Sequence, residues 1–289
     1  MSTLRELKGR IGSVRSSEKI TGAMKMISSA KMHKAEQALN KLVPFRNQLQ
    51  TIMGNLVATD AEYSSELTEV RDVKTAAIVV LGSDGGLCGA YNINLFKGLL
   101  SHINKLREAD PEVKIVVYPV GKKISAAVAK LDLEGVSVGT SIHASKVSAA
   151  DIRNYTAELR DSFLAKEVDS VEVVLMKFIS AGKQRLDVQR LLPVSPDVFG
   201  AEGGNRPYIF EPDANKIYNT ILPLYIISVV QEAFGQNAAS EQAARVMAMQ
   251  SANDNASKLL DDLNLEYNKL RQQGITTELL DILGGQVEK

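Results

Sequence analysis

The segment SDGGLCGAYN at residues 83–92 is the part of the sequence that comes closest to a phosphate-binding loop. It follows the β-branched run TAAIVVL and precedes a helical pattern, and a glycine-rich turn in that position can place backbone N–H groups around an anion. The glycine spacing fits neither known motif, because Gly-x-Gly-x-x-Gly is absent and no Gly-Lys-Ser/Thr follows. We therefore interpret these glycines as a tight strand-to-helix turn.

The remaining reactive side chains form no catalytic or metal-binding pattern. His33, His102 and His143 lack metal-ligand spacing and lack a Ser or Cys partner pattern. Cys88 is the only cysteine, which excludes an intrachain disulfide, and we interpret it as a small buried residue. We expect no catalytic residue, no cofactor and no metal, so the chain is predicted not to be an enzyme by itself.

The composition is that of a soluble globular protein, with 45% hydrophobic and 24% charged residues. Lys+Arg and Asp+Glu balance at 34 each, which speaks against a nucleic-acid partner. The most apolar run, ILPLYIISVV at 221–230, is too short to span a bilayer, and the first residues lack the apolar core of a secretory signal. We expect no direct membrane insertion.

Residues 1–60 predict one long helix. Leu4, Leu7, Ile11 and Val14 recur at helical spacing, and a second pattern resumes in a shifted phase with Ile20, Met24 and Ile27. A heptad then follows, formed by Ala35, Ala38, Leu42, Phe45, Leu49, Ile52 and Leu56. Pro44 interrupts the pattern and is expected to bend the helix.

Residues 74–195 predict a Rossmann-like α/β domain. Strands are expected at 75–81, 114–120, 170–180 and 183–194, the last two as a hairpin turned at Ala181-Gly182. Helices are expected at 92–108, 121–130 and 148–166. This alternation favours a parallel sheet with an antiparallel addition.

Residues 210–286 predict a second long helix. It begins near 211 with Asp213 as a cap, Pro223 should kink or break it, and Leu260, Leu263, Tyr267 and Leu270 restore a heptad near its end. The helical stretches at 2–58 and 224–285 span roughly 85 and 93 Å at about 1.5 Å per residue, against a diameter of about 50 Å for a compact globule. The predicted fold class is therefore α/β, with a long antiparallel coiled coil of the N- and C-terminal helices beside the Rossmann-like domain. The alternative is that both helices break into pieces and form a bundle.

Small side chains dominate two stretches, TGAMKMISSA at 21–30 and NAASEQAARVMAMQSANDNA at 237–256. Ala, Ser and Gly allow close helix contact but bury little area, so such a pair stabilises itself weakly. We infer that another protein surrounds it. A solvated, alanine-rich surface helix is the alternative.

Three segments resemble the gamma subunit of F-type ATP synthases: ITGAMKMISSAKMHKAE (20–36), SDGGLCGAYN (83–92) and the long run 240–285 beginning SEQAARVMAMQ. The resemblance covers both termini and the first βα unit, while residues 100–200 match in length and pattern more than in sequence. It implies a central-stalk rotor subunit that transmits torque between a membrane ion-translocating ring and a catalytic alpha/beta hexamer. Implied partners are the alpha, beta and epsilon subunits and the membrane c-ring.

The resemblance also implies contact residues for the beta subunit. Arg271 and Gln272 match the pair that contacts a loop of beta, and Thr276 and Glu278 lie in the same motif. Met24 and Lys25, with Gln242 and Arg245, match further positions that face beta. Gly85 stands where the family usually has Arg, so any contact made by that Arg is missing here.

Two other functions remain open on the residues alone. One is a nucleotide-binding Rossmann-like enzyme with coiled-coil oligomerisation helices, and the other is a nucleic-acid binder that uses the basic N-terminal helix. The resemblance and the absence of a transit peptide imply a bacterial complex on the cytoplasmic side of the cell inner membrane, where this chain is peripheral.

Overall fold

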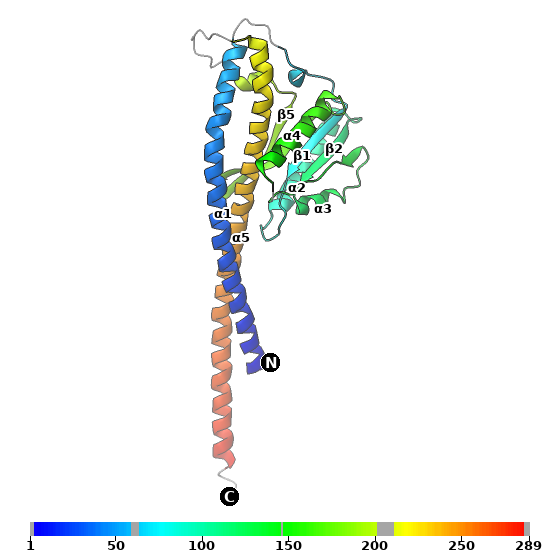
Figure 1. Ribbon diagram of the computed structural model, residues 1–289. Helices are drawn as coiled ribbons and strands as arrows, with labels where there is room; N and C mark the ends of the chain where they lie inside the picture. Colours follow the sequence, from blue (N-terminus) through cyan, green and yellow to red (C-terminus); the bar gives the residue numbers. More distant parts are fainter. Residues whose placement is uncertain (1–2, 59–63, 146, 201–210, 286–289) are drawn as a thin grey trace. The chain divides into compact units, whose positions relative to one another are not determined.

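The computed structural model describes residues 3–58, 64–145, 147–200 and 211–285. The chain divides into two compact units. We call residues 29–244 the sheet unit, and residues 1–28 with 245–289 the helix-pair unit. Two helices, α1 (Leu4–Val57) and α5 (Ala214–Gly285), are continuous in sequence through both units (Figure 1).

The sheet unit contains a five-stranded sheet in the order β3-β2-β1-β4-β5. Strands β1 (Thr75–Leu81), β2 (Lys114–Val120), β3 (Val136–Val138) and β4 (Ser170–Ser180) are parallel, and β5 (Lys183–Leu192) pairs antiparallel with β4. Strands β2 and β3 lie on one side of β1, whereas β4 and β5 lie on the other side. The boundary between β1 and β4 is therefore the switch point of a doubly wound sheet. The predicted α/β order and the hairpin are confirmed.

Helices cover both faces of this sheet. One face packs against α2 (Tyr91–Ala109) and α3 (Lys122–Val128), where Ile78, Ile115 and Leu99 are fully buried. The other face packs against α4 (Ala149–Leu164) and against parts of α1 and α5, with Phe163 and Leu222 fully buried. Alternate buried residues of β1 and β4 therefore belong to different cores, as the period-two side-chain pattern requires.

The part of α1 inside the sheet unit packs against α5. Leu49, Met53 and Leu56 are buried in the same core as Tyr218 and Leu222 of α5. Near this point Gly54 lies against the backbone of the 3₁₀ turn η2 (Pro196–Phe199), since a Cβ on Gly54 would stand 2.7 Å from the Phe199 carbonyl oxygen. A second 3₁₀ turn, η1 (Glu66–Thr68), places Leu67 in the core.

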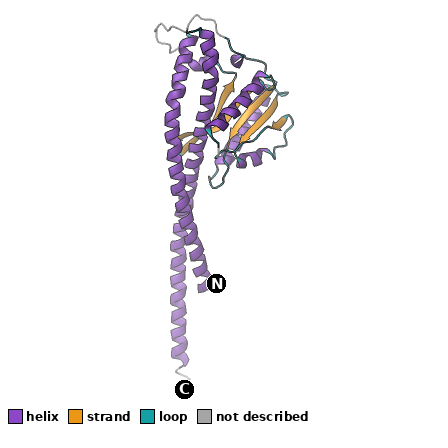
Figure 2. Cartoon of the chain, viewed as in Figure 1, coloured by secondary structure: helices purple, strands orange, loops and turns teal. Residues whose placement is uncertain are grey.

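Apart from Thr3, every residue of the helix-pair unit that the structure describes is helical (Figure 2). Its core is small: Leu7 and Ile11 of α1 meet Leu260 and Leu263 of α5, with Val14, Tyr267 and Leu270 partly buried around them. Farther along the pair, Thr21 Oγ1 lies 3.3 Å from Asn253 Oδ1. Residue numbers increase along α1 while the numbers of the contacted α5 residues decrease. The two helices are therefore antiparallel, as predicted.

Several details differ from the sequence-based expectations. The helix α5 does not break at Pro223, because Leu222 and Ile226 on either side are both buried and their packing outweighs one lost backbone hydrogen bond. Asp213 caps it as predicted, accepting the Lys216 N–H at 2.7 Å. Both long helices are continuous, so the bundle of short pieces is wrong.

The predicted heptad of α1 contains two rows of inward positions, one with Leu49 and Leu56 and the other with Phe45. The structure confirms only the first row. Leu49 and Leu56 are buried, but Phe45 is 52% exposed. The second buried row lies one residue along, at Met32, Leu39 and Met53. Arg46 stands in that row and forms an ion pair with Glu232 of α5, its Nε 2.9 Å from Oε2. A polar residue at an inward position concealed this row from a hydrophobic pattern.

Ile20 and Ile27 are also exposed, at 59% and 56%, although their spacing predicts burial. The short strand β3 was not expected, because three residues are too few for a periodic signal. Strand β5 ends at Leu192 rather than 194, since Pro193 has no N–H to donate to the ladder.

Candidate functional site

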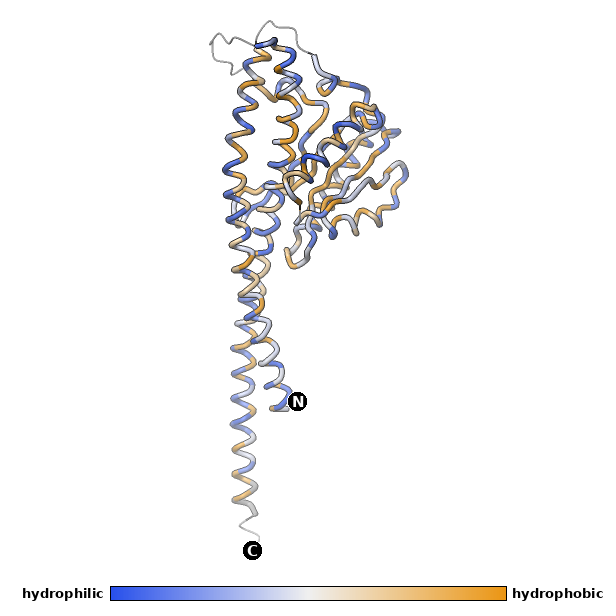
Figure 3. Tube along the Cα trace, viewed as in Figure 1, coloured by the Kyte–Doolittle hydropathy of each residue, from blue (hydrophilic) through white to orange (hydrophobic). Residues whose placement is uncertain are grey.

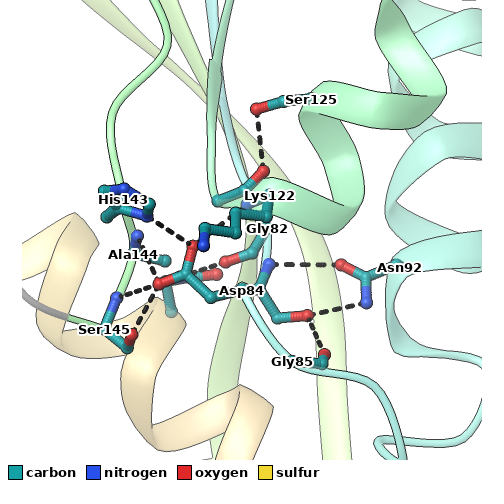
Figure 4. Close-up of polar contacts among 12 residues, drawn as sticks. Gly82, Asp84, Gly85, Asn92, Lys122, Ser125, His143, Ala144 and Ser145 are labelled. Atoms are coloured by element: carbon teal, nitrogen blue, oxygen red, sulfur yellow. Dashed lines mark hydrogen bonds and ion pairs between the residues drawn. The ribbon is translucent and has the colours of Figure 1, made fainter.

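The loop at residues 82–90 connects β1 to α2 at the carboxyl edge of the parallel strands, where doubly wound sheets bind their ligands. Asp84 is its central acceptor (Figure 4). Its Oδ1 accepts the Lys122 N–H at 3.0 Å, and its Oδ2 accepts the N–H groups of Ala144 and Ser145 at 3.1 and 2.8 Å. The His143 ring lies 3.5 Å from the same carboxylate.

These contacts make Asp84 an internal anion. Burial by itself raises the pKa of Asp84, but the hydrogen bonds from Ser145, Lys122 and Ala144 hold the pKa well below its ordinary value of 3.8. The carboxylate accepts hydrogen bonds from the N–H groups that would otherwise be available to an anion at this edge. A bound phosphate would meet a fixed negative charge there, so we interpret the loop as structural. We call Asp84 with its partners Lys122, Ala144 and Ser145 the Asp84 clasp.

Close packing explains the glycines around the clasp. A Cβ on Gly82 would stand 2.6 Å from Ile124, and Gly121 has φ +104° and lies within 2.9 Å of the Ser83 backbone by the same measure. Ser83 Oγ donates to the Gly85 carbonyl at 2.8 Å, and Asn92 Nδ2 donates to Ser83 Oγ at 2.8 Å. The predicted tight strand-to-helix turn is confirmed.

The inner side of the same edge is closed by α5. The buried Asn237 side chain donates from Nδ2 to the Gly82 carbonyl at 2.9 Å, and the Tyr91 hydroxyl donates to Asn237 Oδ1. Both side chains are nearly inaccessible, at 2% and 3% exposure. Protein groups thus fill the position at which a related sheet would hold a nucleotide.

Cys88 is buried at 3% exposure in this loop, as predicted. Within the described ranges, no group of three or more His, Cys, Asp or Glu side chains is arranged to hold a metal ion. One helix, α5, is long and apolar enough to cross a membrane by length and composition alone, but 44% of its most apolar window is buried inside the protein. Leu222, Ile226 and Val230 account for part of this burial in the sheet unit.

Sequence reasoning missed one buried ionic cluster. His102 of α2 contacts Glu172 of β4 through its Nε2, and Arg190 Nε of β5 lies 3.6 Å from the other Glu172 oxygen. Burial by itself raises the pKa of Glu172, but the His102 hydrogen bond and the charges of His102 and Arg190 lower the pKa below its ordinary value. The only available signal was a glutamate inside the apolar strand SVEVVLM, which requires a partner.

The residues expected to bind a partner lie on exposed or half-buried helix surface. Arg271, Gln272, Thr276 and Glu278 are all exposed on α5. Helical spacing places Arg271, Ile275 and Glu278 on one side, with Gln272, Thr276 and Leu279 beside them. The structure therefore gathers these four polar residues around exposed apolar side chains.

The second expected group is less exposed. Met24 and Lys25 of α1 and Arg245 of α5 are half-buried in the helix-pair unit. Gln242 is half-buried as well but belongs to the sheet unit. Gly22 packs closely on Asn253, with a Cβ position 3.1 Å from its Oδ1, which agrees with the expected close approach of the helices.

Large apolar side chains are exposed along the helix-pair unit. Figure 3 shows hydrophobic residues distributed along both of its helices. Those at 48% exposure or more are Ile20, Met26, Ile27, Met247, Leu265, Ile275, Leu279, Leu280 and Ile282. Scattered apolar residues are normal on a surface, but here they outnumber the four buried residues of the unit's core. The unit presents more apolar side chains outward than inward.

A family model described as ATP synthase matches residues 3–287. The ATP synthase gamma chain of Bacteroides fragilis is 40% identical over 293 residues, covering 99% of this chain and all of the relative. The gamma chains of Bacteroides thetaiotaomicron and Francisella tularensis are each 37% identical, and both alignments cover at least 99% of each chain.

Two solved structures share the fold. A chain of the Euglena gracilis mitochondrial ATP synthase (OSCP/F1/c-ring) matches with a TM-score of 0.63 and 20% identity, covering 98% of this chain and 93% of its own. A chain of the Tetrahymena thermophila central stalk/c-ring matches with a TM-score of 0.59 and 24% identity, covering 81% and 99%.

Proposed function

The chain belongs to the family of ATP synthase gamma chains, and from this premise we propose how it works as the rotor subunit of the central stalk. It is a non-catalytic subunit of the ATP synthase complex, and its role is to transmit torque between the membrane ion-translocating ring and the catalytic alpha/beta hexamer. The coupling of ATP synthesis to ion flow then depends on the stiffness and surface of two long helices.

The helix-pair unit carries this proposal. Its core of Leu7, Ile11, Leu260 and Leu263 is too small to explain why α5 stays helical to Gly285 in isolation. Its many exposed apolar side chains favour an enclosing protein that covers them. An axle inside a sleeve has these properties, since it needs a slender section and a surface completed by its surroundings.

We assign the beta subunit to the exposed polar groups of this unit. Arg271 and Gln272 suit a carboxylate-bearing loop, because an arginine side chain can donate two parallel hydrogen bonds to one carboxylate. Thr276 and Glu278 lie on the adjoining surface of the same helix. Met24, Lys25 and Arg245 form a second proposed contact with beta, where Lys25 and Arg245 supply positive charge. Gln242 of the sheet unit is proposed as a separate contact with beta.

Further partners follow from the same role. The alpha subunits complete the sleeve, and the epsilon subunit and the c-ring bind the sheet unit. The complex is membrane-associated, and we place this chain on its cytoplasmic side at the cell inner membrane, peripheral and not inserted. The burial of Leu222, Ile226 and Val230 supports α5 as a core helix rather than a span.

A nucleotide-binding enzyme is not favoured. Its site would lie at the carboxyl edge of β1, where Asp84 occupies the available N–H groups and Asn237 closes the inner side. Isothermal titration of the purified chain with ATP or NAD should give no saturable heat.

The proposal is tested by purifying the tagged chain from its source organism and determining what is bound. Alpha, beta and epsilon subunits in fixed stoichiometry, with ATP hydrolysis in the eluate, are expected. A chain that elutes alone, or in a complex without alpha and beta, would overturn the proposed function.

A further inference from the structure

Four neighbouring residues of α5 contact the rest of the sheet unit with directional geometry. Glu232 pairs with Arg46 of α1 at 2.9 Å. Gly235 lies against Leu39 of α1, because a Cβ there would be 2.7 Å from Leu39 Cδ2. The next two residues, Gln236 and Asn237, turn toward the sheet. We call residues 232–237 the α5 hub.

The sheet side of the hub involves two adjacent strands. Gln236 Oε1 accepts the backbone N–H of Phe178 in β4 at 3.0 Å. Asn237 Nδ2 donates to the Gly82 carbonyl directly after β1 at 2.9 Å, and the Tyr91 hydroxyl at the start of α2 donates to Asn237 Oδ1. Strands β1 and β4 are paired with each other, so both bonds attach α5 to one rigid block.

The hub lies where α5 crosses the carboxyl edge of the sheet. Phe234 packs in the core on the α4 side, and Ala244 packs against the core on the α2 side. Apolar packing alone is not directional and lets a smooth helix turn about its axis. Hydrogen bonds weaken steeply when their angles change, so the contacts of Gln236 and Asn237 resist that turn.

We propose that the α5 hub is the torsional junction of this chain, where Gln236 and Asn237 fix α5 against rotation relative to the sheet. Arg46 and Leu39 hold α5 to α1 through Glu232 and Gly235, so both helices turn with the sheet. This assignment rests on the proposed rotor function and makes Gln236, Asn237 and Tyr91 positioning residues for torque transfer. Without them, the sheet and α5 would still pack but would slip under load.

The electrostatic surroundings keep the junction in one state. Burial, and after it the charge of Glu241, raises the pKa of Tyr91 well above its ordinary value, so its hydroxyl stays protonated and able to donate. The amide of Asn237 does not titrate, and its two polar atoms are both engaged. If an apolar residue replaced Asn237, the Gly82 carbonyl would lose its hydrogen bond from Nδ2.

The test uses the complete ATP synthase complex carrying variants of this chain. A probe is attached through Lys130→Cys, an exposed position of the sheet unit, and Cys88 is too buried to compete for the label. The angular fluctuation of the stalled rotor relative to the immobilised alpha/beta hexamer gives the torsional stiffness. ATP hydrolysis without load and ATP-driven ion pumping are measured on the same preparations.

The double variant Gln236→Leu with Asn237→Leu should lose torsional stiffness and ion pumping while unloaded hydrolysis is retained. Gln231→Leu, a half-buried glutamine of the same helix outside the hub, is the matched control and should keep both. Asn237→Asp keeps the acceptor for Tyr91 and should restore part of the loss. Backbone amides of 236–240 should exchange at least about tenfold faster in the double variant, because it removes several hydrogen bonds and one buried hydrogen bond is worth roughly a factor of ten in an opening equilibrium.

Unchanged stiffness and pumping in a well-assembled double variant would overturn the junction while leaving the rotor function intact. Equal losses in the double variant and in Gln231→Leu would also overturn it, since packing would then be the cause. If the double variant does not assemble, Tyr91→Phe removes one hydroxyl only, and wild-type stiffness in that variant would contradict the proposal. A wild-type chain that does not rotate at all would instead refute the proposed function.

Discussion

The sheet unit and the helix-pair unit differ in how much of their apolar surface they bury within the chain. The sheet unit buries both faces of a five-stranded sheet in two large cores that contain Phe163, Leu95, Ile115 and many others. The helix-pair unit has four buried core residues and a larger number of exposed apolar ones. The first region has cores that stabilise it within this chain, whereas we propose that the second depends on surfaces supplied by other subunits.

The largest effect should come from the core of the sheet unit. Phe163 is fully buried, and its ring also stacks under the Arg71 guanidinium at 4.2 Å. Phe163→Ala should lower the free energy of unfolding by about 3–5 kcal/mol through lost burial and the remaining cavity. Urea unfolding of the purified chain, followed by circular dichroism, measures it. A loss below about 1 kcal/mol would contradict a self-sufficient sheet unit.

A somewhat smaller effect is expected at the buried ionic cluster. His102→Ala removes the closest partner of Glu172 and should cost about 1.5–3 kcal/mol, the usual value for a hydrogen bond to a charged group. The same unfolding experiment near neutral pH checks it. A neutral result would show that Arg190 alone compensates for the buried carboxylate.

The cluster also predicts a pH dependence. Because the folded-state pKa of Glu172 is below its ordinary value of 4.5, the stability it contributes is fully present above that value. It is lost as the pH falls through the lower folded-state pKa. Glu172→Gln should therefore be less stable than wild type near pH 7, and the difference should shrink below pH 4.5. A constant difference between pH 3 and pH 7 (roughly the range over which a shifted carboxylate acts) would count against this assignment.

In the helix-pair unit, a core substitution should leave global unfolding nearly unchanged in the isolated chain. Leu263 is 3% exposed, yet the unit around it can open locally without the sheet unit. Leu263→Ala should shift the global free energy of unfolding by less than about 1 kcal/mol and accelerate amide exchange over 255–270. A shift as large as that of Phe163→Ala would remove the contrast between the two units.

The smallest effect on folding should come from the surface residues proposed to bind beta. Replacing Arg271 and Gln272 with Ala changes exposed side chains and should alter the free energy of unfolding by no more than about 0.5 kcal/mol. The complex should assemble, while ATP synthesis and ion coupling weaken. Lys269→Ala on the same helix is the matched control. Wild-type synthesis and coupling in the double variant would show that the site assignment is wrong.

Sequence patterns were most informative where a segment satisfies its packing within the chain. The β-branched runs at 75–81 and 170–180 predict their strands, because both faces of these strands are buried in this chain. The patterns failed where packing is shared with something else. Ile20 and Ile27 have core spacing but are exposed here. Arg46 is a different case: it packs within this chain, paired with Glu232, but a hydrophobic pattern does not detect a charged residue at an inward position.

The candidate sites divide in the same way. Local sequence predicts the turn at 82–90, because glycine and close packing are local properties. The clasp around Asp84 and the pair of His102 with Glu172 join residues 38–70 positions apart, so no spacing rule finds them. The residues proposed to contact beta were predicted from family resemblance alone, since an exposed arginine on a helix looks like any other solvated charge.

The account rests most directly on rotation of this chain inside its complex. The alpha/beta hexamer is immobilised, a probe is attached at Lys130→Cys, and ATP is added while single complexes are observed. Unidirectional rotation of the probe is the result that the account predicts. A complex that hydrolyses ATP while the probe on this chain stays still would contradict it.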